Sequence, residues 1–233
     1  MKLRIKFTKS GVMKFIGHLD IMRYFQKAMR RADIDISYST GFSPHQIMSF
    51  AAPLGVGLES CGEYFDIEVY SVTNASDMKD RLNAVMVDGI HVESIRMLPE
   101  DAGNAMASVA AAKYTVCFIP SYRVPFDLEH AVKVFMDKES IPVTKQTKKS
   151  IKEMDLKPYI YDMSAGNGAV SLFVDASSSG NVKPNLVMET LFKENGQALP
   201  EFVLQITRMD TYTNTGTAKE PVLVPLGDIG YDF

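Results

Sequence analysis

Basic side chains recur at three- and four-residue steps along one predicted helix. The charged positions of this stripe are Asp20, Arg23, Lys27, Arg30 and Arg31, and Tyr24 stands beside them. Residues at these steps share one face of a helix. Arginine and lysine bind phosphates and a tyrosine ring stacks on a base, so the stripe predicts a surface that follows an RNA backbone. An ordinary solvated helix face would show the same pattern.

Charge is distributed unevenly along the chain. Residues 1–31 contain nine basic side chains and one acid, a local charge of +8, whereas the whole chain of 233 residues carries −3. The overall charge argues against a general nucleic-acid binder. The asymmetry predicts one basic face, to which Lys2, Lys6, Lys9 and Lys14 would add, on an acidic body. A second cluster, Lys145, Lys148, Lys149, Lys152 and Lys157, would extend that face.

Two histidines and an aspartate are the candidate catalytic residues. His18 stands at the start of the basic helix, Asp20 follows it, and His45 lies in a later loop that the fold could bring close. Together they could form a general acid/base group or part of a metal site. Their spacing matches no known ligand pattern, so the alternative is structural: His18 caps the helix or fills a polar pocket, and His45 hydrogen-bonds the backbone of its loop. The sequence therefore predicts no metal site.

Two loops rich in glycine and proline are long for hairpin connections, and such loops often carry function. The first is Gly41-Phe42-Ser43-Pro44 and the second covers residues 53–57. Either could clamp a nucleotide or a partner peptide. Gly55 and Gly57 do not begin a Gly-x-Gly-x-x-Gly motif, because residue 60 is serine, and no phosphate-binding loop motif is present. No nucleotide cofactor is expected.

Cysteine usage and the N-terminus indicate a cytoplasmic protein. Cys61 and Cys117 are the two cysteines, and they fall in different predicted domains, so no disulfide framework is expected. The first residues do not have the pattern of a secretory signal, and the longest apolar run is far shorter than the about 20 residues that cross a bilayer.

Hydrophobic periodicity predicts the same order of elements in each half of the chain. In the first half, strands are expected at residues 3–7, 35–38, 63–70 and 91–98, and helices at 19–32 and 76–89. In the second half, extended segments are expected at 113–119, 142–146, 151–163, 169–175 and 202–211, and helices at 126–138 and 184–196. Each half reads approximately β-α-β-β-α-β, the order of the ferredoxin-like unit, with one additional extended segment in the second half.

The predicted fold is therefore α+β, a tandem of two ferredoxin-like units with antiparallel sheets. The first domain would cover residues 1–99 and carry the basic helix, and the second would cover residues 105–212. Residues 213–233 would form an extended tail.

Parts of the first half resemble a known family. The resemblance lies in the segment from Phe15-Ile16-Gly17-His18-Leu19-Asp20 to Gly41-Phe42-Ser43-Pro44-His45, and continues through Ser49-Phe50-Ala51-Ala52-Pro53-Leu54-Gly55 and Glu63-Tyr64-Phe65-Asp66. The family is the radical-SAM-linked (radical-SAM-associated) proteins, a domain of unknown function. Its domain occurs as a separate chain or attached to a radical-SAM protein, which implies a radical-SAM partner.

The chain cannot by itself hold the cluster of such a partner. A radical-SAM [4Fe–4S] centre needs three cysteines in a Cys-x-x-x-Cys-x-x-Cys run, and the chain has two isolated cysteines. No cofactor is expected.

These observations predict an accessory protein that binds an RNA, with tRNA as one candidate, and presents it to a radical-SAM partner. Two alternatives stay open. One is a metal-independent RNA-processing enzyme, because tandem ferredoxin-like units resemble the layout of CRISPR repeat endoribonucleases, an analogy of fold only. The other is a protein–protein adaptor. Whether the chain is an enzyme is thus left undecided, and no membrane association is expected.

Overall fold

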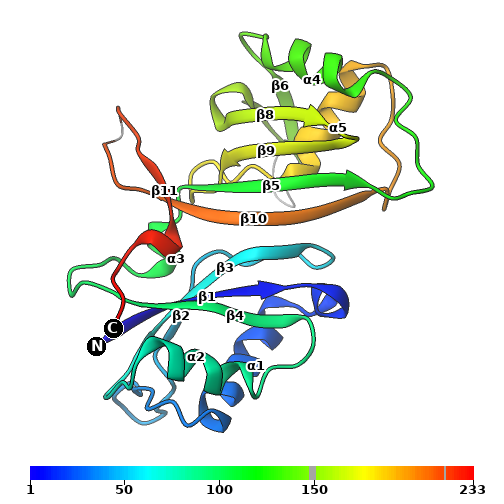
Figure 1. Ribbon diagram of the computed structural model, residues 1–233. Coiled ribbons are helices and arrows are strands. Elements are labelled where there is room, and N and C mark those ends of the chain that lie inside the picture. The colour runs from blue at the N-terminus through cyan, green and yellow to red at the C-terminus, as the bar shows by residue number, and fades with distance from the viewer. Residues whose placement is uncertain (147–150, 218) are drawn as a thin grey trace. The chain divides into compact units, whose positions relative to one another are not determined.

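A computed structural model describes residues 1–146, 151–217 and 219–233, and the chain divides into two compact units (Figure 1). The first unit contains Met1–Ala110 and Arg208–Phe233, and the second contains Ala111–Thr207. No helix of the described ranges is long and apolar enough to cross a membrane.

The first unit is built on an antiparallel sheet. Its strands are β1 (Lys2–Lys9), β2 (Met48–Phe50), β3 (Glu59–Glu68) and β4 (Ile90–Met97). Its helices are α1 (His18–Arg31), α2 (Ala75–Asn83) and the short α3 (Ala105–Ser108), and a 3-10 turn, η1 (Gly11–Phe15), precedes α1. β1 lies between β4 and β3, and β2 pairs with the other side of β3.

An aromatic core joins the sheet of this unit to its helices. Alternation along β1 directs Leu3, Ile5 and Phe7 to one face, where they are buried. The ring of Phe25 from α1 lies 4.7 Å from that of Phe7 and 4.6 Å from that of Phe65. Met78 and Leu82 of α2 belong to the same core, so both helices pack on the sheet.

The opposite face of β1 is polar, with Arg4 buried and Lys2, Lys6 and Thr8 partly buried. Nε and Nη2 of Arg4 donate to Oδ1 and Oδ2 of Asp66 at 2.8 and 2.9 Å, a two-pronged ion pair that leaves the arginine 2% exposed. Further along β1, Nζ of Lys6 donates to Asp210 at 2.8 Å. The C-terminal residues supply part of this cover, because Leu226 is buried and its carbonyl oxygen lies 3.5 Å from Arg4.

The C-terminal segment is folded into the first unit. β10 (Leu204–Asn214) pairs with β11 (Leu223–Pro225), which leads into the 3-10 turn η3 (Leu226–Asp228), and Tyr231 forms a bridge with Met97 of β4. The predicted extended tail at residues 213–233 thus contains a strand and a turn.

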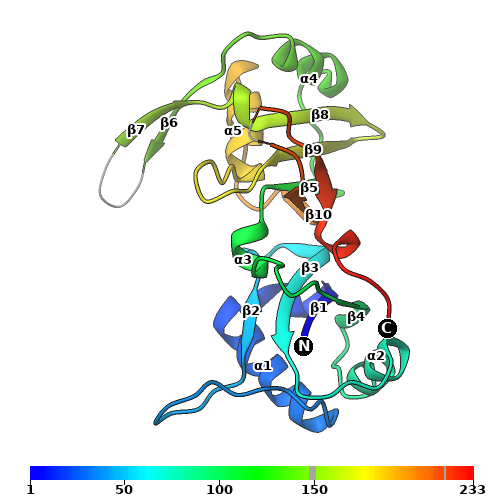
Figure 2. The same cartoon turned by 90° about the vertical axis from the view of Figure 1, so that its left-hand side faces the viewer.

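In the second unit, strands β5, β9 and β8 pair antiparallel in that order. Its strands are β5 (Ala111–Phe118), β6 (Pro142–Gln146), β7 (Ile151–Asp155), β8 (Ile160–Gly166) and β9 (Ala169–Asp175), and its helices are α4 (Leu128–Met136) and α5 (Pro184–Glu194), with a 3-10 turn η2 (Lys157–Tyr159). β6 and β7 form a separate hairpin that extends from the rest of this unit (Figure 2).

The α+β class and the mostly antiparallel strand pairing are confirmed. A tandem of two ferredoxin-like units stays a prediction. Residues 35–38 pair only through isolated bridges at Ile36 and Tyr38, and the regular strand is β2, further along the chain. The chain leaves the first unit after Ala110 and returns to it at Arg208, within β10.

The ion pair of Arg4 and Asp66 gives a test of the fold. We expect Asp66→Ala to lower the free energy of unfolding by about 3–5 kcal/mol, because it leaves a buried guanidinium without its carboxylate. Asp20→Ala is the matched control, since Asp20 pairs with Arg23 at 3.3 Å on the exposed face of α1 and should cost less than about 1 kcal/mol. Urea denaturation followed by circular dichroism measures both, and equal losses would contradict the expectation.

Candidate nucleic-acid-binding site

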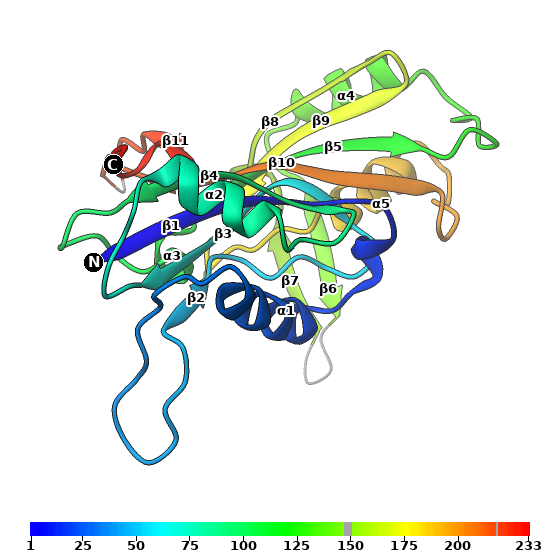
Figure 3. The same ribbon diagram turned by 60° about the horizontal axis from the view of Figure 1, so that its bottom comes forward.

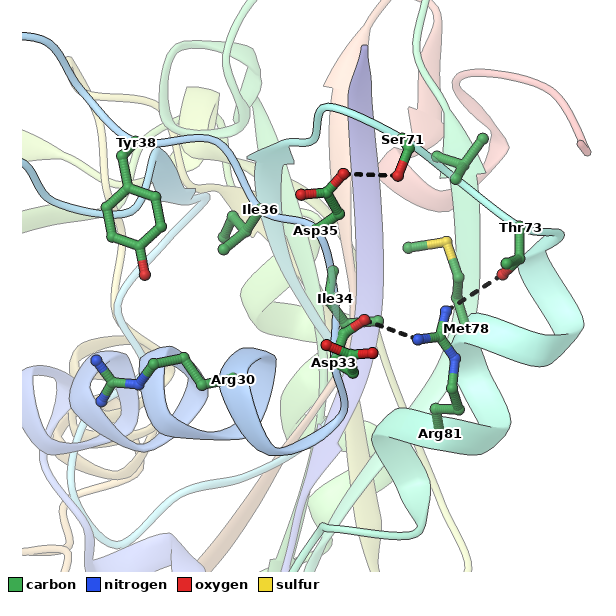
Figure 4. Close-up of a pocket in the computed structure, with 11 residues that line it drawn as sticks. Arg30, Asp33, Ile34, Asp35, Ile36, Tyr38, Ser71, Thr73, Met78 and Arg81 are labelled. Carbon is green, nitrogen blue, oxygen red and sulfur yellow. Dashed lines mark hydrogen bonds between the residues drawn. The ribbon is translucent and has the colours of Figure 1, made fainter.

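The first unit contains a cavity of about 520 Å³ beside the C-terminal end of α1 (Figure 4). Three segments surround it: the chain after α1, the loop after β3, and α2. The lining residues are Arg30, Asp33, Ile34, Asp35, Ile36, Tyr38, Ser71, Val72, Thr73, Met78 and Arg81. This size falls in the range of about 300–1,000 Å³ that is typical of small-molecule sites.

Arg81 fixes the shape of the cavity. Its Nη1 donates to the carbonyl oxygens of Ala32 and Asp33 at 3.1 and 2.8 Å, which ties the end of α1 to α2. Its Nε donates to Asp77 at 3.0 Å and its Nη2 to Thr73 at 3.2 Å. Asp33, with a φ of 53°, turns the chain in the left-handed region directly after the helix. All three guanidinium nitrogens are therefore engaged in holding the cavity wall.

Three side chains with binding chemistry face this space. Arg30 extends from α1 toward the side of the cavity on which the Tyr38 ring lies (Figure 4). The Tyr38 side of the cavity is open, as this residue is 41% exposed. Asp35 accepts a hydrogen bond of 2.6 Å from the Ser71 hydroxyl. A guanidinium, an accessible aromatic ring and a carboxylate thus share one cavity.

The basic stripe of α1 leads to this cavity. Arg23, Lys27, Arg30 and Arg31 are all exposed, as the sequence predicts for a solvated helix face. Arg23 forms an ion pair with Asp20 at 3.3 Å, but both side chains are about two-thirds exposed and such pairs are weak. Seven residues separate Arg23 from Arg30, a rise of about 10 Å along the helix.

The other N-terminal cations do not contribute as expected. Arg4 and Lys9 are buried, and the Nζ of Lys9 donates to the carbonyl oxygen of Ile16 at 2.8 Å. Lys6 is paired with Asp210 and Lys14 with Glu59. The basic surface is thus narrower than the local charge of +8 suggests.

Most of the second lysine cluster falls on side chains that the structure does not describe. Lys148 and Lys149 lie outside the described residues, and only the backbone of Lys145 and Lys152 is described. Lys157 donates to the carbonyl oxygen of Met136.

Tyr24 does not have the position of a stacking platform. Its hydroxyl accepts from the backbone N–H of Val87 at 2.8 Å and donates to the sulfur of Met86 at 3.4 Å. Its ring packs edge-on against Phe25, with 5.6 Å between the centroids. Tyr38 is the accessible aromatic residue near the basic stripe. Tyr38 was not predicted as a site residue, although it lies three residues before the predicted loop.

The loop Gly41-Phe42-Ser43-Pro44 is the tip of a two-stranded ribbon. Tyr38 and Gln46 form its bridge, and the backbone N–H of Ser39 donates to the carbonyl oxygen of His45 at 2.8 Å. The ribbon extends away from the unit beyond the C-terminal end of α1 (Figure 3). Phe42 at its tip is fully exposed. A single exposed apolar ring is common on protein surfaces, so Phe42 is accessible to a ligand but does not by itself identify a contact surface.

The structure does not bring the three candidate catalytic residues together. His18 is the first residue of α1, and its ring lies edge-on to Phe50 with 5.4 Å between the centroids. His45 lies in the ribbon, where the hydroxyl of Ser39 is 2.8 Å from its Nδ1. Asp20 is engaged with Arg23. His18 does not cap the helix, because the N-cap of α1 is Gly17 and has no side-chain cap hydrogen bond. The His45 ring bonds a side chain of its own loop.

His18 instead lines a second, smaller cavity together with two buried charged residues, Lys9 and Glu63. Its volume of about 20 Å³ is enough for about one water molecule. Glu63 accepts from Nη1 of Arg208 at 2.9 Å. The sequence indicates this cluster only through charged residues within two strands, Lys9 in β1 and Glu63 in β3. That these side chains lie close together depends on how the strands pair.

Burial changes the proton affinity of this cluster. It lowers the pKa of His18, and the positive charge of Lys9 adds to the effect. It also lowers the pKa of Lys9 and raises the pKa of Glu63, although Arg208 and a hydrogen bond from Ser60 oppose the change at Glu63. Across the described part of the chain, no group of three or more His, Cys, Asp or Glu side chains could hold a metal ion.

Residues 2–184 match the model of a protein family that is described as an uncharacterized protein conserved in bacteria (DUF2344). The chain belongs to this family. No curated protein matches it. The DUF2344 match covers α1, the ribbon and every residue that lines the larger cavity. The family description names no reaction or partner, so the radical-SAM link stays a prediction.

The lowered pKa of His18 predicts how stability depends on pH. Between that pKa and the ordinary value of 6.5, the unfolded chain binds a proton that the folded chain does not. The contribution of neutral His18 to the free energy of unfolding therefore decreases as the pH falls from 6.5 through the lowered pKa. Between about pH 7.5 and about pH 5.5, wild type should lose more free energy of unfolding than His18→Gln.

The matched control for this experiment is His45→Gln, which removes an exposed histidine from the ribbon. Over the same pH range this variant should lose as much free energy of unfolding as wild type. Glu63 acts in the opposite direction above its own ordinary pKa, so the difference between wild type and His18→Gln is the quantity to measure. Identical pH curves for wild type and His18→Gln would contradict the assignment.

Proposed function

We propose that this DUF2344 protein binds a single-stranded segment of RNA and presents it to a radical-SAM partner, without catalysing a reaction itself. The observation that carries the proposal is that the basic stripe of α1 ends, at Arg30, in the cavity that also contains the accessible ring of Tyr38. Charge for the backbone and an aromatic platform for a base are the two elements of single-strand recognition.

The phosphate contacts would come from α1. Arg23, Lys27 and Arg30 share one helix face, so they can contact successive phosphates of one strand. These cations belong to a chain with a net charge of −3, so the rest of the surface would not attract a polyanion. A localised basic stripe therefore favours one binding path.

The base contacts would come from the chain after α1. Tyr38 can stack on a base in the cavity, and Phe42 at the ribbon tip can stack on a neighbouring base. The cavity has room for about one nucleoside. Because a base inside a duplex is already stacked, this geometry favours a loop or an unpaired strand.

The partner and the finer fold assignment belong to the same proposal. The resemblance of residues 15–68 to the radical-SAM-linked proteins supports a radical-SAM partner, which would supply the chemistry. The β-α-β-β-α-β order of the first unit supports a ferredoxin-like assignment, with the β6–β7 hairpin as an addition to a second such unit.

The predicted alternative of an RNA-processing enzyme has less support. Its best candidate is His18 beside Lys9 and Glu63, since these side chains could exchange protons. That cavity has room for about one water molecule, and His45 is absent from its lining. We therefore favour a binding role over a catalytic one.

Salt-dependent RNA binding tests the proposal. Purified protein is titrated into labelled small RNA at low and at moderate salt, and affinity is measured by fluorescence anisotropy. The triple variant Arg23→Glu/Lys27→Glu/Arg30→Glu should lose most of the affinity and most of its salt dependence, because phosphate contacts release counterions.

The control is Arg123→Glu/Lys133→Glu/Lys193→Glu, which makes the same change in net charge at exposed positions of the second unit. It should retain most of the wild-type affinity. Equal losses in the two triple variants would show that net charge alone drives binding. An absence of RNA binding by wild type at low salt would overturn the proposal and favour the protein–protein adaptor.

Tyr38→Ala tests the stacking contact. Loss of one stacked base should weaken RNA binding by about 5- to 150-fold, the equivalent of about 1–3 kcal/mol. Phe202→Ala, which removes a highly exposed ring of the second unit, should leave affinity unchanged. The experiment uses the same anisotropy titration, and an unaltered affinity for Tyr38→Ala would rule out this ring as the platform.

A further inference from the structure

We propose that the larger cavity selects a ribonucleoside, and that Asp35 distinguishes RNA from DNA by accepting a hydrogen bond from the ribose 2′-hydroxyl. This inference rests on the proposed RNA-binding function and identifies what the same site reads. It follows from the position, the orientation and the charge of one carboxylate.

Asp35 is fixed in the cavity wall by its neighbours. Ile34 and Ile36 on either side are buried in the core, so alternation directs the Asp35 side chain outward. Its backbone is also held, because the N–H of Tyr70 donates to the Asp35 carbonyl oxygen at 2.9 Å. The carboxylate therefore belongs to a rigid part of the cavity.

The hydrogen bond with Ser71 orients the carboxylate. The Ser71 hydroxyl donates to Oδ2 at 2.6 Å. Figure 4 shows the other oxygen pointing away from Ser71, toward the side of the cavity on which Tyr38 lies. Among the described residues, no lysine or arginine forms an ion pair with Asp35, and Arg81 is fully engaged with other groups. Oδ1 is thus an oriented acceptor that faces the cavity.

An ionised carboxylate only accepts hydrogen bonds, so it favours a ligand that presents a hydroxyl or an amine. Asp33 places a second carboxylate in the same wall, and two carboxylates beside the single Arg81 guanidinium make this side unfavourable for a phosphate. Arg30 is the cation on the other side of the cavity.

A nucleotide fits a cavity with carboxylates on one side and a cation on the other in one orientation. Its phosphate lies toward Arg30, its base on Tyr38 and its ribose toward Asp35. The 2′-hydroxyl is the donor that RNA has and DNA lacks.

The experiment compares three labelled single strands of the same sequence: RNA, DNA and 2′-O-methyl RNA. Wild type should bind RNA roughly tenfold more tightly than either of the others, since a hydrogen bond to a charged acceptor contributes about that much. In Asp35→Ala, RNA affinity should fall to the level of DNA, while DNA affinity should stay the same or rise.

Asp33→Asn is the matched control, because it removes a carboxylate from the same wall and asparagine tolerates the positive φ of that position. It should keep the preference for RNA. Thermal unfolding checks that both variants fold.

The outcomes separate the two proposals. If wild type binds RNA and DNA tightly and with equal affinity, the role of Asp35 is overturned but RNA binding stands. The same holds if the preference for RNA survives in Asp35→Ala. No binding of any strand at low salt would overturn the proposed function, and this inference with it.

Discussion

The contacts of Arg81 are the constraint on which the candidate site depends. A helix ends with carbonyl groups that have no partner within the helix, and here the guanidinium of α2 binds the carbonyl oxygens of Ala32 and Asp33 just after α1. This contact fixes the direction in which the chain leaves α1. Arg30 before the turn, and Asp35 and Tyr38 after it, thereby face one space. A single structural arginine thus positions three side chains, although its own hydrogen bonds are to Ala32, Asp33, Thr73 and Asp77.

Sequence periodicity could predict the helix face but not the fate of every cation. Alternation along β1 correctly separates Leu3 and Ile5 from Arg4 and Lys6, yet it cannot say what covers the polar side. That cover comes from Asp66, Asp210 and Leu226, and the last two are more than 200 residues away in the chain. Local patterning has no information about such partners, so counting charges overestimated the basic surface.

The dependence on distant partners also explains which candidate residues the sequence predicted correctly and which it did not. The spacing of three and four residues identified the stripe on α1 because helix geometry is local. Tyr24 shares that segment, but the tertiary contact with Val87 and Met86 occupies its hydroxyl. The accessible ring, Tyr38, lies 14 positions later. Likewise, the expected meeting of His18 and His45 required a path for the ribbon that the sequence does not determine, and the ribbon leaves from the opposite end of α1 from His18.

The two polar sites of the first unit therefore lie at opposite ends of one helix. His18 and Arg30 are 12 residues apart, a rise of about 18 Å along α1. At that distance the interaction of the His18 charge with the exposed Arg30 guanidinium is strongly screened at physiological ionic strength. Protonation of His18 should thus change the stability of the unit without directly changing the charge that an RNA phosphate encounters at Arg30. The small buried cluster would stabilise the start of α1, and the end of the helix would carry recognition, so one element can be altered at either end with separable effects.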